Sequence, residues 1–267
     1  MSGRSPIITL LTDFGSEACF VGVMKGVIAS IAPRAVVIDL CHEAPPRRAA
    51  TAGFLLASAY AYFPPGTVHA AVVDPGVGTA RAALAIKAKG FYFVVPDNGL
   101  IVPALAGPEE ADEIVRIENE ACFLKPVSRT FHGRDIFAPA AARIACGVPL
   151  SALGRAVSGF DRGSFPAVAR ARSPDGAEAL QGEVIHIDRF GNLVTNIRGL
   201  ERGRVLSVRC ASCEVRGLQE TFADVEEGSA LAFIGSSGYL EIAVRGGSAA
   251  GSLGAETGEK VHVKIRS

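Results

Sequence analysis

The sequence predicts an α/β protein of two domains. A Rossmann-like N-terminal domain with a mostly parallel sheet is followed by a smaller, all-β, barrel-like domain. Apolar strand-like runs alternate with helical periodicity over residues 7–146, and only short β-rich runs follow from residue 182. A polar stretch rich in Gly, Pro and Ser at 170–176 lies between them. A chain of 267 residues is long enough for two domains, which we expect at 1–172 and 178–267.

The N-terminal half repeats the order strand, polar turn, helix. Residues 7–11 are an apolar strand, and the next helix has apolar positions at Phe20, Val23, Val27 and Ile31 and ends before Pro33. Further elements are expected as strands at 35–40 and 67–73, helices at 49–62 and 136–146, and a hairpin of 83–87 with 91–95. Alternation of this kind predicts parallel strands joined by right-handed crossovers.

The C-terminal half lacks helical periodicity. Its short β-rich runs are separated by Gly, Asn and Ser turns, which is typical of a small barrel or sandwich. The expected strands are 182–187, 193–197, 205–209, 230–234, 239–244 and 261–265.

Composition narrows the class of function. Apolar residues make up 49% and charged residues 20% of the chain, as in globular proteins. The formal net charge is zero, so neither nucleic acid nor a membrane surface is expected as a partner. No apolar run is long enough for a signal sequence or a membrane span. Six scattered cysteines, including the close pair Cys210 and Cys213, indicate reduced core thiols of a cytoplasmic protein rather than disulfides or a metal site.

Acidic residues follow several predicted strands. They are Asp13, the Asp39–His42 segment, Asp74 and the pair Asp97–Asn98. A single aspartate there is often only a helix cap or a turn residue. Because ligands of parallel sheets bind beyond the carboxyl ends of the strands, four such groups in succession indicate a binding edge.

Two segments carry the strongest candidates for chemistry. Asp74 is followed by a glycine-rich turn and by Arg81, without the spacing of a Walker or dinucleotide phosphate loop. The segment 130–135 places His132 beside an Arg–Asp pair. Three other histidines, His69, His186 and His262, are interpreted as structural. The sequence does not decide between a structural and a functional role for His42. No nucleophile elbow is present, so covalent catalysis is not indicated.

Six motifs along nearly the whole chain resemble the S-adenosylmethionine hydroxide adenosyltransferases, relatives of the fluorinase and chlorinase. The motifs are Thr12-Asp-Phe-Gly15, Val73-Asp-Pro-Gly-Val-Gly78, Asp97-Asn-Gly99, Thr130-Phe-His-Gly-Arg-Asp135, Asp188-Arg-Phe-Gly-Asn192 and Gly235-Ser-Ser-Gly-Tyr-Leu-Glu241. The resemblance implies an enzyme in which water or hydroxide attacks the 5′ carbon of S-adenosylmethionine, giving adenosine and L-methionine.

The resemblance also implies residue roles. Asp74, Arg81 and His132 correspond to the family's set that positions and activates the water, with no metal and no cofactor. Water, with a pKa of about 15.7, needs such help at neutral pH. Substrate contacts are implied for Asp13 on the ribose, Phe131, Asp188 at the amino group, Phe190, Asn192, Phe222, Ser236 and Ser237. The family's sites lie between subunits of a homotrimer.

Two alternatives stay open. One is a halide-dependent adenosyltransferase. Halide-using relatives carry an aromatic residue where Asp74 stands and a serine where Gly133 stands. These differences place halide use well behind the reaction with water. Near the fluorinase's aromatic wall this chain has Arg47. The other alternative is a non-catalytic module that binds adenosine or S-adenosylmethionine through Asp13 and the C-terminal domain.

Overall fold

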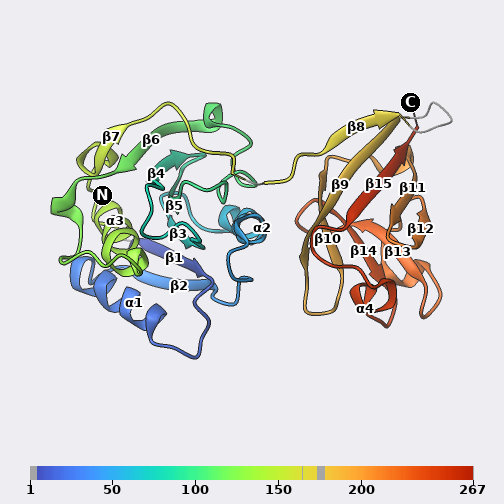
Figure 1. The fold of residues 1–267 in the computed structure, drawn as a ribbon, viewed down its shortest axis with the longest axis horizontal. Helices are drawn as coiled ribbons and strands as arrows, with labels where there is room; N and C mark the ends of the chain where they lie inside the picture. The colour runs from blue at the N-terminus through green and yellow to red at the C-terminus, as the bar shows by residue number, and fades with distance from the viewer. Residues whose placement is uncertain (1–4, 164, 173–177, 267) are drawn as a thin grey trace. The chain divides into compact units, whose positions relative to one another are not determined.

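The computed structural model describes residues 5–163, 165–172 and 178–266. The chain forms two compact units, residues 1–165 and 166–267 (Figure 1). The predicted domains differ from these units at residues 166–172. Part of that segment forms a strand that pairs within the second unit. Residues 173–176 of the predicted linker, 170–176, lie outside the described residues.

The first unit contains one sheet of seven strands in the order β2-β1-β3-β5-β4-β6-β7. The strands are β1 (Ile7–Thr12), β2 (Val36–Cys41), β3 (Val68–Val72), β4 (Ala83–Ala88), β5 (Phe91–Pro96), β6 (Ala111–Ile117) and β7 (Gly154–Ala156). The helices are α1 (Phe20–Ile31), α2 (Ala49–Ala59) and α3 (Ala138–Ala145).

The sheet is mixed rather than mostly parallel. Strands β2, β1, β3 and β5 pair in parallel, whereas the pairs β5–β4, β4–β6 and β6–β7 are antiparallel. The change of direction begins at the hairpin of β4 and β5, where Lys89 and Gly90 both have positive φ angles of 53° and 82°. Two left-handed residues make the tight turn that joins antiparallel strands. The sequence predicts this hairpin, so its prediction of a mostly parallel sheet was wrong for the second half of the sheet.

Helices cover both faces of this sheet (Figure 1). Ile8 and Leu10 of β1 face a core shared with α1 and α3, while Leu11 faces a second core shared with α2. This alternation follows from the period of two along a strand. The helical period of α1 is confirmed, but its fully buried residues are Met24 and Ile28.

Two apolar positions of α1 that the sequence singles out lie at the surface. Phe20 is 45% exposed and Val23 is 36% exposed. Strands β6 and β7 were not predicted. Their sequences are charged or only three residues long, so alternation gives little signal.

The second unit is built from antiparallel strands in the order β12-β11-β15-β9-β10-β14-β13, with β8 paired to β9. The elements are β8 (Ala169–Arg172), β9 (Glu178–Ile187), β10 (Leu193–Arg198), β11 (Val205–Cys210), β12 (Cys213–Arg216), β13 (Ala230–Ile234), β14 (Tyr239–Val244), α4 (Ala249–Leu253) and β15 (Lys260–Ile265). All six predicted strands are confirmed, and the short elements β8, β12 and α4 are additional.

The long strand β9 makes the sheet of the second unit nearly barrel-shaped. Residues 178–183 pair with β15, and residues 184–187 pair with β10. At the other end, backbone contact between Gln219 and Ala232 connects the segment after β12 to β13. The strands therefore curl around one core that contains Leu193, Leu240 and Val263.

All six cysteines are free thiols. Cys122 and Cys210 are buried, but Cys19 and Cys146 are exposed, so the expectation that all lie in the core was wrong. Within the described ranges, no helix has the length and apolar character needed to cross a membrane.

Candidate active site

The carboxyl ends of the parallel strands gather polar groups at one edge of the first sheet. Asp13 directly follows β1, Asp74 follows β3 and Asp97 follows β5. Asp39 departs from this pattern because it lies within β2, and it is His42 that follows the strand. Since β4 runs antiparallel to β5, the beginning of β4 and the preceding Arg81 come to the same edge.

The loop from Asp74 to Arg81 is closed by tight turns. The Val77 amide donates to the Asp74 carbonyl (3.2 Å) and the Thr79 amide to the Gly76 carbonyl (3.1 Å). Gly78 has a φ of +78°, and a Cβ there would overlap the carbonyl oxygen of Arg129. Glycine therefore serves two needs, the left-handed backbone and the close approach of the segment that leads to His132.

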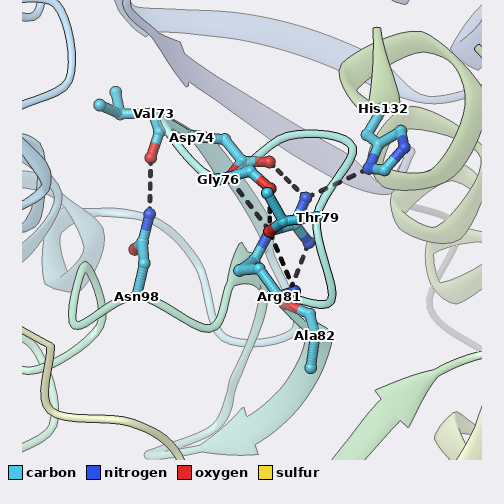
Figure 2. Close-up of polar contacts among 8 residues, drawn as sticks. All are labelled: Val73, Asp74, Gly76, Thr79, Arg81, Ala82, Asn98 and His132. Atoms are coloured by element: carbon cyan, nitrogen blue, oxygen red, sulfur yellow. Dashed lines mark hydrogen bonds and ion pairs between the residues drawn. The ribbon is translucent and has the colours of Figure 1, made fainter. Parts of the chain in front are cut away.

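Arg81 joins the other two predicted catalytic residues (Figure 2). Its Nε donates to Asp74 Oδ1 (3.0 Å), its Nη2 donates to Asp74 Oδ2, and the same Nη2 lies 3.2 Å from His132 Nδ1. The Arg81 and Asp74 side chains are only 8% and 5% exposed. Arg81 also donates from Nη1 to the Ala82 carbonyl (3.0 Å), and its guanidinium lies 5.3 Å from the ring centre of Phe137. The group is thus a rigid carboxylate, guanidinium and imidazole cluster.

The contact with Arg81 defines the state of His132. A guanidinium only donates hydrogen bonds, so His132 Nδ1 must accept and the ring must be neutral, with its proton on Nε2. Burial and the positive charge of Arg81 lower the pKa of His132, while Asp74, Asp135 and a hydrogen bond to the Ser128 backbone oppose this shift. His132 therefore presents a donor N–H at neutral pH.

Asn98 holds the strand end that precedes Asp74. Its Nδ2 donates to the Val73 carbonyl (2.9 Å), and its Oδ1 accepts from the Leu100 amide (3.2 Å), as Figure 2 shows for the first contact. Asp97 accepts from the Asp161 amide (2.7 Å). Burial raises the pKa of Asp97, which Arg81 partly offsets. The sequence marks these residues only as polar groups after a strand, and their partners are visible only in the fold.

The remaining predicted contacts of the first unit are Asp13 and Phe131. Asp13 Oδ2 accepts from the Arg47 amide (3.1 Å). Phe131 directly precedes His132 and packs edge-on against Phe14 and Phe20, with ring centres 5.8 and 5.1 Å apart.

Gly133 fits closely against helix α1. A Cβ at this residue would meet Met24 Sδ and a Phe14 ring carbon, each at 3.1 Å. Such contacts are tighter than usual, so a serine at this position would have to displace its neighbours.

Most of the predicted contacts of the second unit surround one cleft of about 890 Å³. Asp188, Phe190, Asn192, Phe222 and Ser236 line it, while Ser237 belongs to the same turn as Ser236 but not to the lining. A cleft of this size with aromatic walls and a few polar groups is typical of a small-molecule site. The individual substrate contacts stay predictions.

The turn after β9 is organised by Asp188. Its Oδ1 accepts from the amides of Phe190 (2.8 Å) and Asn192 (2.9 Å), and its Oδ2 accepts from the Asn192 side chain (2.8 Å). Phe190 is left 77% exposed at the tip of this turn. The carboxylate thus fixes two of the residues that line the cleft.

Glu241 also lines the cleft, although from the sequence it was predicted only as part of a motif. It lies on β14, and burial together with the charge of Asp188 raises its pKa to about 7. Its carboxylate lies against Gly235, where a Cβ would push the end of the Glu241 side chain aside. Two carboxyl groups in one aromatic cleft favour a ligand that carries positive charge.

The other polar groups near the sheet edge are paired. His42 lies 2.9 Å from Thr12 Oγ1 through Nδ1 and 3.0 Å from Asp39 Oδ1 through Nε2. Burial acts to raise the pKa of Asp39, but hydrogen bonds from Lys25 and His42 outweigh it and lower the pKa. Among the described residues, no three His, Cys, Asp or Glu side chains are grouped so that they could hold a metal ion.

Fold and site together define the class: an α/β unit with a charged cluster over its sheet edge, followed by a β unit with an aromatic, acidic cleft. Two family models match the chain, the SAM hydroxide adenosyltransferase N-terminal domain over residues 8–154 and its C-terminal domain over residues 182–262. The chain belongs to the SAM hydroxide adenosyltransferase family.

Relatives and solved structures agree with this assignment. The chain is 41% identical to an (R)-S-adenosyl-L-methionine hydrolase of Thermus thermophilus, over 96% of this chain and 98% of the relative. A fluorinase of Nocardia brasiliensis is 28% identical over 99% and 98%. The crystal structure of an uncharacterized conserved protein from Thermotoga maritima superposes with a TM-score of 0.84 and 37% identity, covering 96% of this chain and 99% of that chain.

Proposed function

We propose that this protein is a hydrolase that converts S-adenosyl-L-methionine and water to adenosine and L-methionine. The observation that carries the proposal is the direct connection of Asp74, Arg81 and His132 in one partly buried cluster. Membership of the family and the hydrolase relatives at about 40% identity support it.

The cluster suits the activation of a water molecule. The Asp74 carboxylate keeps lone pairs beyond those that Arg81 occupies, so it can accept an O–H bond of the water and orient its oxygen. The Arg81 guanidinium and the Nε2–H of His132 stabilise negative charge that develops on that oxygen. Because Nδ1 already accepts from Arg81, His132 acts as a donor here, and Asp74 is the better candidate for the first proton acceptor.

The reaction is balanced without any further reagent. The water oxygen forms a bond to C5′ of the substrate, and the C5′–sulfur bond breaks with its electron pair left on sulfur, which becomes the neutral thioether of methionine. The proton of the water passes through the cluster to solvent. The sulfonium is a good leaving group, so alignment of the attack is the main task of the protein. We include no cofactor and no metal in this proposal.

Substrate recognition is assigned to both units. We place the ribose at Asp13 and the aromatic surface of Phe131, and we place adenine and the methionine part in the cleft of the second unit. There Phe190 and Phe222 offer stacking surface, Asn192 a paired donor and acceptor, and Ser236 and Ser237 hydroxyl groups for the carboxylate. Asp188 and Glu241 match the two positive charges of the substrate.

Isotope incorporation tests the activity. The purified protein is incubated with S-adenosylmethionine in ¹⁸O-water, and adenosine should carry the label in its 5′-hydroxyl. Both sulfonium epimers are supplied separately, since the hydrolase relatives are named for the (R) form. The proposal would be contradicted if neither epimer gave adenosine, or if the adenosine carried no label.

Asp74→Asn separates a catalyst from a binding module. The amide keeps the shape of the side chain but loses the charge that holds Arg81, so turnover should fall at least 100-fold while adenosine still binds. Arg143→Lys on α3, outside the cluster, is the matched control and should keep its turnover. Equal turnover of Asp74→Asn and wild type would remove Asp74 from the mechanism.

The halide alternative is tested in the same assay. With molar chloride or fluoride present, a halide-dependent enzyme would form 5′-halo-5′-deoxyadenosine. The tight packing at Gly133 and the carboxylate at residue 74 favour adenosine as the only product. Detection of the halogenated nucleoside would reverse that preference.

We also propose a homotrimer with sites between subunits, in the cytoplasm. The division of the predicted contacts over two units supports a site that needs both, and six free thiols suit a reducing compartment. Asp74→Asn and Asn192→Ala chains are expressed separately and together. If one subunit supplies Asp74 and another supplies Asn192, the co-expressed chains regain activity, whereas sites within one chain would stay inactive. Light scattering gives the number of subunits.

A further inference from the structure

His132 is held in a short segment of unusual backbone. It directly precedes a π-helical turn, Gly133–Phe137, which continues into α3. Turns of this type are rare and occur often at functional sites, because the extra residue in the turn redirects the neighbouring side chains. No side chain caps this turn at His132. Other contacts must therefore fix the segment.

A fully buried carboxylate supplies those contacts. Asp135 is 0% exposed, and its Oδ2 accepts from the backbone amide of Ser128 (2.8 Å). Its two oxygens also accept from Arg134, at 2.6 Å from Nε and 3.0 Å from Nη2. Adjacent residues of an α-helix do not face each other, so this two-point pairing of neighbours depends on the π-helical turn. It leaves the Asp135 charge fully hydrogen-bonded, as a buried carboxylate requires.

The pairing also directs Arg134 back over the segment. The Arg134 guanidinium lies 5.3 Å from the ring centre of Phe131, three residues earlier. Phe131 is itself held edge-on between Phe14 and Phe20. Phe131 precedes His132 in the chain, and Arg134 and Asp135 follow it. Together these three residues form a brace, which holds the backbone on both sides of His132.

The brace extends to the loop that carries Arg81. Ser128, whose amide Asp135 holds, is bonded through its hydroxyl to Thr130 (3.1 Å to the amide). Between them, the Arg129 carbonyl lies against Gly78, with no room for a Cβ. A shift of residues 128–132 would therefore move His132 away from Arg81, and the contact of 3.2 Å between them would be lost.

We infer that Asp135 and Arg134 are positioning residues of the active site, which hold His132 in reach of Arg81. The inference rests on the proposed function. Neither residue has to touch the substrate. The charged groups that face His132 are Arg81 and Asp74 on the loop and Asp135 on its own turn, and the negative charge of Asp135 opposes the effect of Arg81.

Three variants test the brace. Asp135→Asn keeps an acceptor for Ser128 but removes the charge. Arg134→Lys keeps the charge but loses the two-point pairing and the stacking on Phe131. Arg143→Lys, an arginine of α3 that donates to the Ala121 carbonyl (3.4 Å), is the control. We expect kcat to fall about 10- to 100-fold in Asp135→Asn and about tenfold in Arg134→Lys, with KM changed less than threefold, because misplacement of the cluster affects the reacting geometry.

A second measurement excludes a merely structural role. The ring of His132 is titrated by NMR in each folded variant, which needs no turnover and so stays informative if the proposed function fails. Asp135→Asn should lower the His132 midpoint and shift the acidic limb of the kcat profile in the same direction, whereas Arg143→Lys should change neither. If Asp135→Asn does not fold, the kcat of Arg134→Lys alone tests the inference. Unchanged kcat in folded Arg134→Lys, or an unchanged His132 midpoint in folded Asp135→Asn, would overturn the inference.

Discussion

His69 makes the stability of the first unit depend on pH. The ring is completely buried on β3 among Tyr60, Phe91 and Phe93, and its Nδ1 lies 2.8 Å from Thr9 Oγ1. Burial lowers the pKa of His69 from 6.5 to about 4. The folded protein therefore keeps His69 neutral at a pH where the unfolded chain binds a proton. The stability associated with this group is complete above pH 6.5 and is lost as the pH falls toward 4.

The linkage relation gives the size of the effect. With these two pKa values, the free energy of unfolding falls by about 1 kcal/mol at pH 5.5 and by about 2 to 3 kcal/mol at pH 4.5, relative to pH 8. Replacing both hydrogen-bond partners, His69→Phe with Thr9→Val, removes the titrating group without leaving a buried hydroxyl unpaired. The double variant should lack this part of the pH dependence.

Urea unfolding followed by far-UV circular dichroism measures the difference, since the chain has no tryptophan to report by fluorescence. The free energies of wild type and double variant are compared at about pH 8, 5.5 and 4.5, so that all other groups cancel. His262→Gln in the second unit is the control histidine. If wild type and double variant lose stability in parallel, His69 is not held neutral by burial and the reasoning is refuted.

Three further predictions concern the two sites. Gly78→Ala should lower kcat more than 10-fold, because the added Cβ displaces the Arg129 carbonyl and with it His132, the partner of Arg81. Steady-state kinetics checks this, and a change in KM alone would contradict it. Arg81→Lys should lose activity to a similar degree despite its retained charge, since a lysine cannot pair with a carboxylate at two points; recovery by added guanidinium would support this reason. Glu241→Gln should stabilise the second unit at pH 8 but hardly at about pH 3.5. A carboxyl pKa raised from 4.5 to about 7 costs stability only where the unfolded chain has lost the proton. Thermal unfolding at both pH values decides, and equal shifts would contradict it.

Local sequence signals predicted most of the elements that form the core. Short apolar runs predicted the strands around Ile8 and Leu240, and the Lys89–Gly90 turn predicted the hairpin at which the first sheet changes direction. The mixed direction of the sheet escaped prediction because it depends on which strand pairs with β4, and pairing is a property of the whole fold. The buried face of α1 was missed for a similar reason, since apolar residues surround much of that helix.

The candidate site was predicted in its residues but not in its contacts. Asp74, Arg81 and His132 stood out because charged residues at strand ends are informative. The tautomer of His132 could not be predicted, because it follows from a contact between residues 51 positions apart. Glu241 alternates regularly with apolar residues of its strand, so only the cleft and the nearby Asp188 reveal it as unusual.

The loop between β3 and β4 begins and ends at the same edge of the sheet, although β5 lies between these two strands. Asn98, at the end of β5, ties the start of this loop to the strand beneath it. Both ends are therefore anchored by main-chain pairing that does not depend on the side chains at residues 74–81. As a result, a graft of the corresponding segment from a relative would change the side chains of the proposed active site while the pairing of the sheet is kept. The choice of nucleophile and the stability of the scaffold can thus vary independently in this architecture.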